Sequence, residues 1–175
     1  RIADALGIPN AGIALNGRMA ADFVEIAARV AGRPTPRLAF IEWIDPPMSG
    51  GHWMPELIGI SGGINLFGEK GAQSPWISLD EVVAADPDVI LVGPCGYDIA
   101  KTQIEMGVLD SNPLWQGLRA VREGQLFVAD GNAFFNRPGP RLVESAQILA
   151  EILHPQVANY GHMGKNVVRH TSTGV

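Results

Sequence analysis

Residues 126–141 read LFVADGNAFFNRPGPR, and this stretch predicts the class of fold. Leu126–Ala129 is a short apolar run of the kind that forms a buried strand. From Leu142 onward, apolar residues recur at the spacing of one helix face. Pro140 suits a first helical turn, because its missing N–H has no partner there in any case. A strand therefore leads into a helix, through a loop that carries more aromatic and basic side chains than a turn requires.

The loop places four notable side chains where the strand ends, namely Phe134, Phe135, Asn136 and Arg137. In an open α/β sheet, ligands bind at the carboxyl ends of the strands. We therefore expect these four residues to contact a ligand. The alternative is that the two phenylalanines simply cap the hydrophobic core.

Two further strands are predicted earlier in the chain, at 37–44 and 89–92, with helical patterns between the strands. Strands that alternate with helices predict an α/β fold: a three-layer, Rossmann-like lobe with a mostly parallel sheet and right-handed crossovers. The division that we predict is a lead-in at 1–15, a connecting helix at 16–33, the lobe at 34–155 and a flexible tail at 156–175.

The exits of the first two strands also carry aromatic residues. Trp43 and Trp53 follow the first strand, and Tyr97 follows the second. Because these exits share one edge of a parallel sheet, the rings should form a common face that holds a large, flat, partly apolar ligand without transforming it. His52 lies at the first exit and can hydrogen-bond this ligand or bind a metal. A lone histidine is more often structural, so we expect no metal site.

No catalytic motif accompanies these rings. Gly59–Gly63 matches G-x-S-x-G, but that motif needs a strand before its serine, and here a helix ends at the glycines. Cys95 has no neighbouring histidine or acid and is expected to be a small buried thiol. We expect no catalytic residue and no cofactor. A small α/β enzyme that uses His52 or Ser61 remains the alternative.

Ser78 and Glu81 have the spacing of a capping box, which opens a helix that runs to Ala85. The box explains Glu81 by local structure. Asp80 is not used by the box and should face solvent. An acid in a first helical turn is usually only a favourable partner of the helix dipole.

The composition excludes several classes of protein. The 175 residues suffice for one domain with a core, and 46% hydrophobic with 18% charged residues is typical of a globular protein. A net charge of −5 provides no basic surface for nucleic acid. A single cysteine excludes an intrachain disulfide. We find no run as long as a membrane span and no signal peptide. The sequence starts at Arg1 without Met, so an export signal or a preceding domain is left open.

Several segments together resemble the carboxyl-terminal lobe of cobalamin-binding proteins, which are substrate-binding components of ABC importers for cobalamin and ferric siderophores. The segment ADPDVI is general to that broad family, whereas WIDPP and FNRPGPR are more specific to its cobalamin branch. The resemblance covers about residues 16–155. It rests on Glu42–Pro47, Gly51–Leu57, Pro75–Trp76, Ser78–Glu81, Ala85–Ile90 and Asp130–Arg141.

The resemblance implies two Rossmann-like lobes, joined by a long rigid helix, that clasp a corrinoid such as cobalamin for delivery to a membrane permease. It implies a periplasmic or extracytoplasmic location. Trp76 matches a tryptophan that lines the corrinoid pocket, and residues 134–137 match another ligand-facing stretch. Asp80, with Glu81 beside it, matches the acid that pairs with permease arginines.

The chain departs from the family in lacking the amino-terminal lobe. The missing lobe, or a second copy of this chain, would complete the clasp. A ferric siderophore or haem is the alternative ligand. A purely structural module would instead bury Trp76 and Phe134 in a subunit contact.

Overall fold

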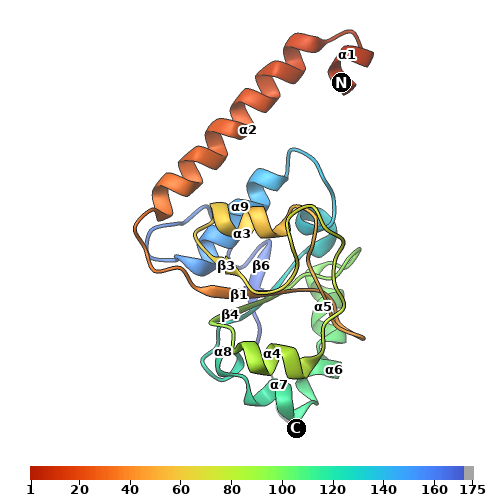
Figure 1. The fold of residues 1–175 in the computed structure, drawn as a ribbon, viewed down its shortest axis with the longest axis vertical. Coiled ribbons are helices and arrows are strands. Elements are labelled where there is room, and N and C mark those ends of the chain that lie inside the picture. The colour runs from red at the N-terminus through yellow and green to blue at the C-terminus, as the bar shows by residue number, and fades with distance from the viewer. Residues whose placement is uncertain (172–175) are drawn as a thin grey trace.

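The computed structural model describes residues 1–171, and a central sheet with helices on both faces dominates it (Figure 1). The strands are β1 (Arg37–Trp43), β2 (Met48–Ser49), β3 (Ile64–Asn65), β4 (Val89–Val92), β5 (Leu126–Ala129) and β6 (Val167–Arg169). The longer helices are α2 (Pro9–Val30), α3 (Met54–Ile60), α4 (Leu79–Ala85), α5 (Ile99–Glu105) and α9 (Leu142–Leu153). The short helical turns are α1 (Ile2–Ala5), α6 (Gly107–Asp110), α7 (Pro113–Gly117), α8 (Arg119–Arg122) and the π-helical turn η1 (Gly131–Phe135).

Strands β1, β4 and β5 form the parallel centre of the sheet. Strands β2 and β3 both pair with β1 at one edge, and β6 pairs antiparallel with β5 at the other, which gives the order β2-β1-β4-β5-β6. The predicted α/β class with a mostly parallel sheet is confirmed. All residues of β4 and β5 are buried, as expected for parallel strands that are covered on both faces.

The two faces of the sheet carry separate cores. Helices α2, α3 and α9 cover one face, and α4 to α8 cover the other (Figure 1). Side chains alternate between the faces along each strand. Leu91 therefore belongs to the core under α9, whereas its neighbours Ile90 and Val92 belong to the core around Trp115. This is the three-layer arrangement that the sequence predicts.

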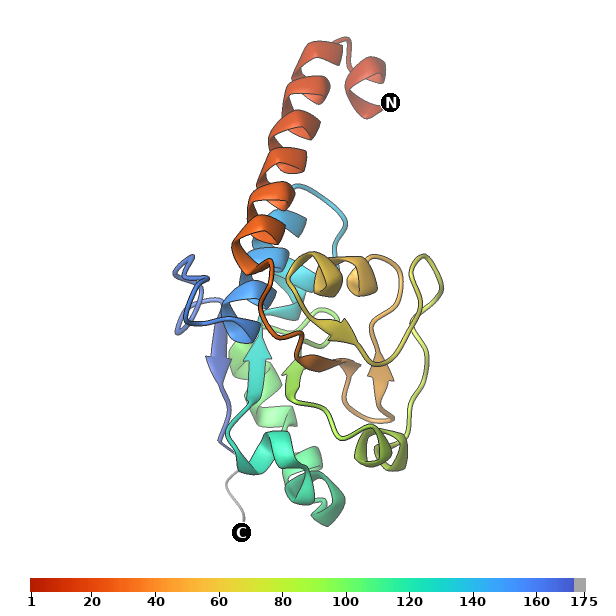
Figure 2. The same cartoon turned by 60° about the vertical axis from the view of Figure 1, so that its left-hand side comes forward.

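The long helix begins earlier than predicted. Helix α2 starts at Pro9, so the expected lead-in at 1–15 contains α1 and the first turns of α2. Pro9 occupies a position where a helix loses no hydrogen bond. Gly12 and Gly17 each weaken a helix by about 1 kcal/mol, which is not enough to end it. The amino-terminal half of α2 projects away from the lobe (Figure 2).

The flexible tail predicted at 156–175 is wrong for residues 156–171. Strand β6 pairs with β5, with Val167 opposite Ala129, and the Val167 side chain is fully buried. Two adjacent valines are too few to give a strand pattern in the sequence. Residues 172–175 lie outside the described part of the chain.

Glu151, on α9, anchors the chain that leads to β6. Its buried carboxylate accepts hydrogen bonds from three backbone N–H groups: those of Tyr160 at 3.0 Å, His162 at 3.1 Å and Met163 at 2.8 Å. Burial by itself raises the pKa of this carboxyl, but the three donors, with Met163 contributing most, outweigh burial and lower the pKa below its ordinary value.

We predict that Glu151→Gln lowers the free energy of unfolding by about 2–3 kcal/mol near neutral pH, because the amide is uncharged and leaves N–H groups unpaired. The folded-state pKa is lowered, so the stabilisation is complete above the unfolded-state pKa of about 4.3 and is lost as the pH falls through the folded-state pKa. Denaturant unfolding of both proteins across this pH range checks it. Exposed Glu69→Gln is the control, and a stability gap that does not change with pH would contradict the assignment.

Candidate functional site

The loops that leave β1, β4 and β5 meet at one edge of the sheet and are bonded to one another. The Gly93 N–H, after β4, donates to the carbonyl oxygen of Ile41 in β1 at 3.0 Å. The Asn132 N–H, after β5, donates to the carbonyl oxygen of Tyr97 at 3.1 Å. We call this region the carboxyl edge; it comprises residues 43–53, 93–98 and 130–141.

Gly131 shows how closely the third loop packs on the second. A Cβ atom at this position would lie 2.2 Å from the carbonyl oxygen of Pro94 and 2.5 Å from that of Gly93. Only glycine allows such an approach of two backbones. The first loop joins them through Trp53, whose indole N–H donates to the carbonyl oxygen of Phe135 at 3.1 Å. The three exits therefore form one continuous structure.

Trp43 and Tyr97 come together at this edge, as predicted. Both are half-buried, and their ring centroids lie 5.4 Å apart. Lys101, in the first turn of α5, lies over the Tyr97 ring with its Nζ atom 3.7 Å from the centroid. Lys101 is not among the residues predicted from the sequence. Its spacing of four residues from Tyr97 is the signal that would have indicated it.

Trp76 and His52 lie in two segments that run beside each other. Trp76 forms an antiparallel bridge with Met48, and its side chain is 63% exposed. The His52 N–H donates to the carbonyl oxygen of Ala72 at 2.7 Å. The His52 side chain is exposed, and its ring centroid lies 5.8 Å from that of half-buried Trp53. Exposed rings from both segments are therefore available to a ligand.

Three of the residues that we expected to contact a ligand instead make contacts within the protein. Phe134 and Phe135 are 7% and 1% exposed, and the Phe135 ring lies 5.4 Å from that of Phe40 in the core. The Asn136 side-chain amide donates to the carbonyl oxygens of Gly93 and Gly131 at 3.1 and 3.0 Å. The structure therefore favours the alternative in which both phenylalanines cap the core.

Arg137 differs from the three residues before it, because its side chain is exposed. Its Nη2 atom donates to Oδ1 of Asn132 at 2.7 Å, which holds the guanidinium at the carboxyl edge. Asn132 is not among the residues predicted from the sequence, because its role depends on this contact with Arg137. Arg137 is available to an anionic group of a ligand.

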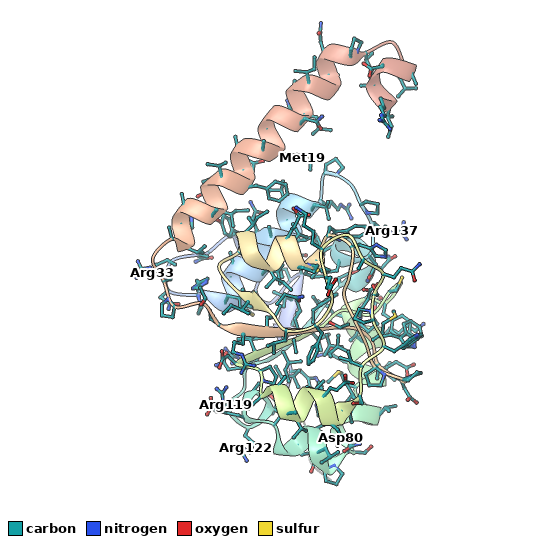
Figure 3. All side chains as sticks on the ribbon, in the orientation of Figure 1. Met19, Arg33, Asp80, Arg119, Arg122 and Arg137 are labelled. Carbon is teal, nitrogen blue, oxygen red and sulfur yellow. The ribbon has the colours of Figure 1, made fainter. Side chains whose placement is uncertain are left out.

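Asp80 and Glu81 separate into two roles at the start of α4. The Glu81 carboxylate accepts from the backbone N–H of Ser78 at 2.7 Å and from its hydroxyl at 2.8 Å, and these two bonds lower the Glu81 pKa. The predicted capping box is confirmed. Asp80 is exposed, and it lies on the opposite side of the sheet from Arg137 (Figure 3).

Ser61, one of the two residues of the enzyme alternative, lies in the interior of the fold. Ser61 is fully buried, and its hydroxyl donates to the carbonyl oxygen of Ala146 at 2.8 Å. Cys95 is exposed, contrary to the buried thiol that we predicted, because the turn after β4 carries it out of the sheet.

Residues 1–171 contain no cluster of three or more metal-ligating side chains. None of the helices in this part of the chain has both the length and the apolar composition of a membrane span.

Comparison with known proteins identifies related sequences. The family described as periplasmic binding protein matches residues 1–133. A curated vitamin B12-binding protein of Vibrio cholerae serotype O1 is 27% identical over 101 residues, which cover 57% of this chain and 33% of that protein. The match thus spans about a third of the length of the curated relatives.

Several solved structures share the fold. An ABC transporter substrate-binding protein from Listeria monocytogenes EGD-e has a TM-score of 0.78 at 16% identity, over 89% of this chain and 61% of that chain. An S. aureus protein complexed with heme has a TM-score of 0.75 at 16% identity, over 87% and 61% of the two chains. The periplasmic vitamin B12 binding protein of Vibrio cholerae has a TM-score of 0.58 at 21% identity, over 76% and 49%. At these identities the likeness shows the fold alone.

We predict that Phe135→Ala lowers the stability of the protein much more than Trp76→Ala does. Truncating the buried Phe135 ring should lower the free energy of unfolding by about 3–5 kcal/mol, because it opens a cavity in the core. Truncating the exposed Trp76 ring should change it by less than about 0.5 kcal/mol. Denaturant unfolding measures both. Equal losses in the two variants would show that Trp76 is a core residue.

Proposed function

The chain belongs to the periplasmic binding protein family, and we propose that it is the carboxyl-terminal lobe of the substrate-binding component of an ABC importer. It holds a corrinoid such as cobalamin at the carboxyl edge, outside the cytoplasm, for delivery to a membrane permease. The lobe binds its ligand without changing it chemically. The observation that carries this proposal is the exposed indole of Trp76 beside the joined exits of the three parallel strands.

The side chains at the carboxyl edge suit a large, flat ligand. Trp43, Trp53 and Tyr97 are half-buried, so each ring is fixed by packing and still presents a surface. Rigid rings of this kind contribute apolar contact at little entropic cost, and a few polar groups around them fix orientation. Arg137 and His52 are such polar groups, since both are exposed. We propose these six residues, Trp76 included, as the ligand contacts of this lobe.

Cobalamin is the leading ligand because the more specific sequence resemblances and the curated relative both concern vitamin B12 binding. Haem or a ferric siderophore is the second candidate. The exposed His52 and Arg137 favour it, because imidazole binds iron and guanidinium binds carboxylates. The absorption spectrum of ligand that copurifies with the protein distinguishes the two.

A single lobe provides one side of a clasp. We propose that an amino-terminal lobe, or a second copy of this chain, faces the carboxyl edge and completes the site. The length of the matched relatives supports the first form, since the match covers 33% of the curated protein.

Asp80 is the proposed contact with the permease. It lies in the first turn of α4, in the helical layer on the far side of the sheet from Arg137 (Figure 3), so it can contact a second protein without touching ligand. Glu81, which we also expected at the permease, has its carboxylate occupied by Ser78. We therefore assign docking to Asp80, with Glu81 holding the helix start.

Trp76→Ala should weaken cobalamin binding about tenfold or more, because it removes apolar contact worth about 1.5–3 kcal/mol. Calorimetric titration of cobalamin, into this chain alone and into the chain together with its amino-terminal lobe, measures the loss. Ile104→Ala, which truncates an exposed apolar residue on α5, is the matched control and should bind as the parent does. Equal affinity of the Trp76 and Ile104 variants would remove Trp76 from the site, and no binding in either form would remove cobalamin.

Asp80→Ala should leave ligand affinity unchanged and impair ligand uptake through the permease, because it removes an exposed surface charge. Uptake in cells that depend on the protein, compared with affinity in solution, separates the two effects. Glu123→Gln is the control, because Glu123 is exposed at the other end of this helical layer. Normal uptake by the Asp80 variant would refute the docking assignment.

A further inference from the structure

Helix α2 contacts the lobe through one face of its carboxyl-terminal half. Ile26 and Val30 are buried, and Met19 and Phe23 pack partly against the same core, which includes residues of α3 and α9. These four positions lie on one helix face. They hold α2 down onto the lobe.

Within residues 1–171, the amino-terminal half of α2 has no fully buried residue. Ile13 is 70% exposed, and a hollow of about 410 Å³ is lined by residues of α2 between Leu15 and Asp22 and by residues at the start of α9. From Glu25 to Pro9 the helix extends about 24 Å, at 1.5 Å per residue. A swing of about 10° at its base therefore moves its tip by about 4 Å. Small contacts near the base decide where the tip lies.

Tyr160 provides a contact on the flank of α2. Its hydroxyl donates to Oε2 of Glu25 at 3.0 Å, across 135 residues of sequence. The Arg29 guanidinium lies 5.2 Å from the centroid of the Tyr160 ring, and its Nε atom donates to Glu25 Oε1 at 2.8 Å. Glu25 and Arg29 are one turn apart, beside the buried face and not on it. The trio therefore ties α2 to the lobe on a second side, in addition to its buried face.

Tyr160 is itself fixed to the lobe. Its backbone N–H donates to the Glu151 carboxylate of α9 at 3.0 Å. Two residues later, the buried His162 ring contacts the Gln147 side-chain oxygen of α9 at 3.2 Å and the Asn166 side chain at 2.7 Å. Burial, with the bond to Glu25, raises the pKa of the Tyr160 phenol, so it remains a donor at neutral pH. Residues 160–162 are thus held on α9 through the Tyr160 backbone N–H group and the His162 ring.

We propose that the loop at residues 157–166 is a brace between α9 and α2, in which Tyr160 sets the direction in which α2 leaves the lobe. Glu151 fixes the base of the brace, and Glu25 with Arg29 receives its tip. The brace determines where the amino-terminal end of α2 is held relative to the carboxyl edge. It acts on the helix itself and does not depend on which ligand the edge binds.

The distance between the carboxyl edge and the tip of α2 tests the brace. Cys95, the single cysteine, is exposed and takes one spin label, and exposed Asn10→Cys takes the second. Relative to the doubly labelled parent, Tyr160→Phe should broaden the distance distribution, and Tyr160→Ala should broaden it further, with shifts of about 4 Å for each 10° of swing. Val24→Ala, beside Glu25 but 69% exposed, is the matched control and should leave the distribution unchanged.

Glu25→Ala removes the hydrogen bond between Tyr160 and Glu25 by changing the residue on α2. If Tyr160→Ala does not fold, the Glu25→Ala variant provides the test of the brace. A broader distribution with an unchanged melting temperature supports a positioning role, because a purely stabilising contact would not move the tip. Distributions in Tyr160→Phe and Glu25→Ala as narrow as in the parent, and centred at the same distance, would overturn the proposal.

Discussion

The parallel register of β1, β4 and β5 is the constraint on which the rest of the structure depends. Ile41 pairs with Val92, and Val92 pairs with Val128, so the three strands end almost in one row. Their exits must then leave the sheet side by side. The bonds between the exits, and the close approach of Gly131 to the backbone of Pro94, follow from this alignment. A shift of register in any one strand would separate the loops.

The aromatic residues near the shared edge form two groups that differ in burial. Phe134 and Phe135 lie in η1, which folds back over the sheet, and their rings close the end of the core. Trp43, Trp53, Tyr97 and Trp76 lie in turns or strand ends where the backbone faces outward. The buried rings hold the loops in place, whereas the outer rings remain partly exposed to solvent. Core packing thus gives the proposed ligand surface its rigidity.

The three layers also separate three proposed roles. The carboxyl edge gathers side chains from all three central strands, whereas Asp80 belongs to the helical layer on one face. The other face carries α9, which is bonded through Glu151 to Tyr160, and Tyr160 in turn contacts Glu25 near the base of α2. The proposed ligand contact, permease contact and helix placement therefore use different surfaces of one small lobe.

The sequence by itself determined the fold class, the three central strands, the capping box at Ser78 and the family resemblance. These features depend on local patterns: apolar runs, helical spacing and motifs a few residues long. It also determined that Trp43, Tyr97, Trp53 and the phenylalanines follow strand ends. Tertiary structure alone decided which rings face inward, because burial depends on which backbone packs above each side chain. It likewise decided that residues 156–171 pack on the lobe and that Tyr160 contacts α2. The first depends on a strand too short to show a pattern, and the second joins residues 135 positions apart.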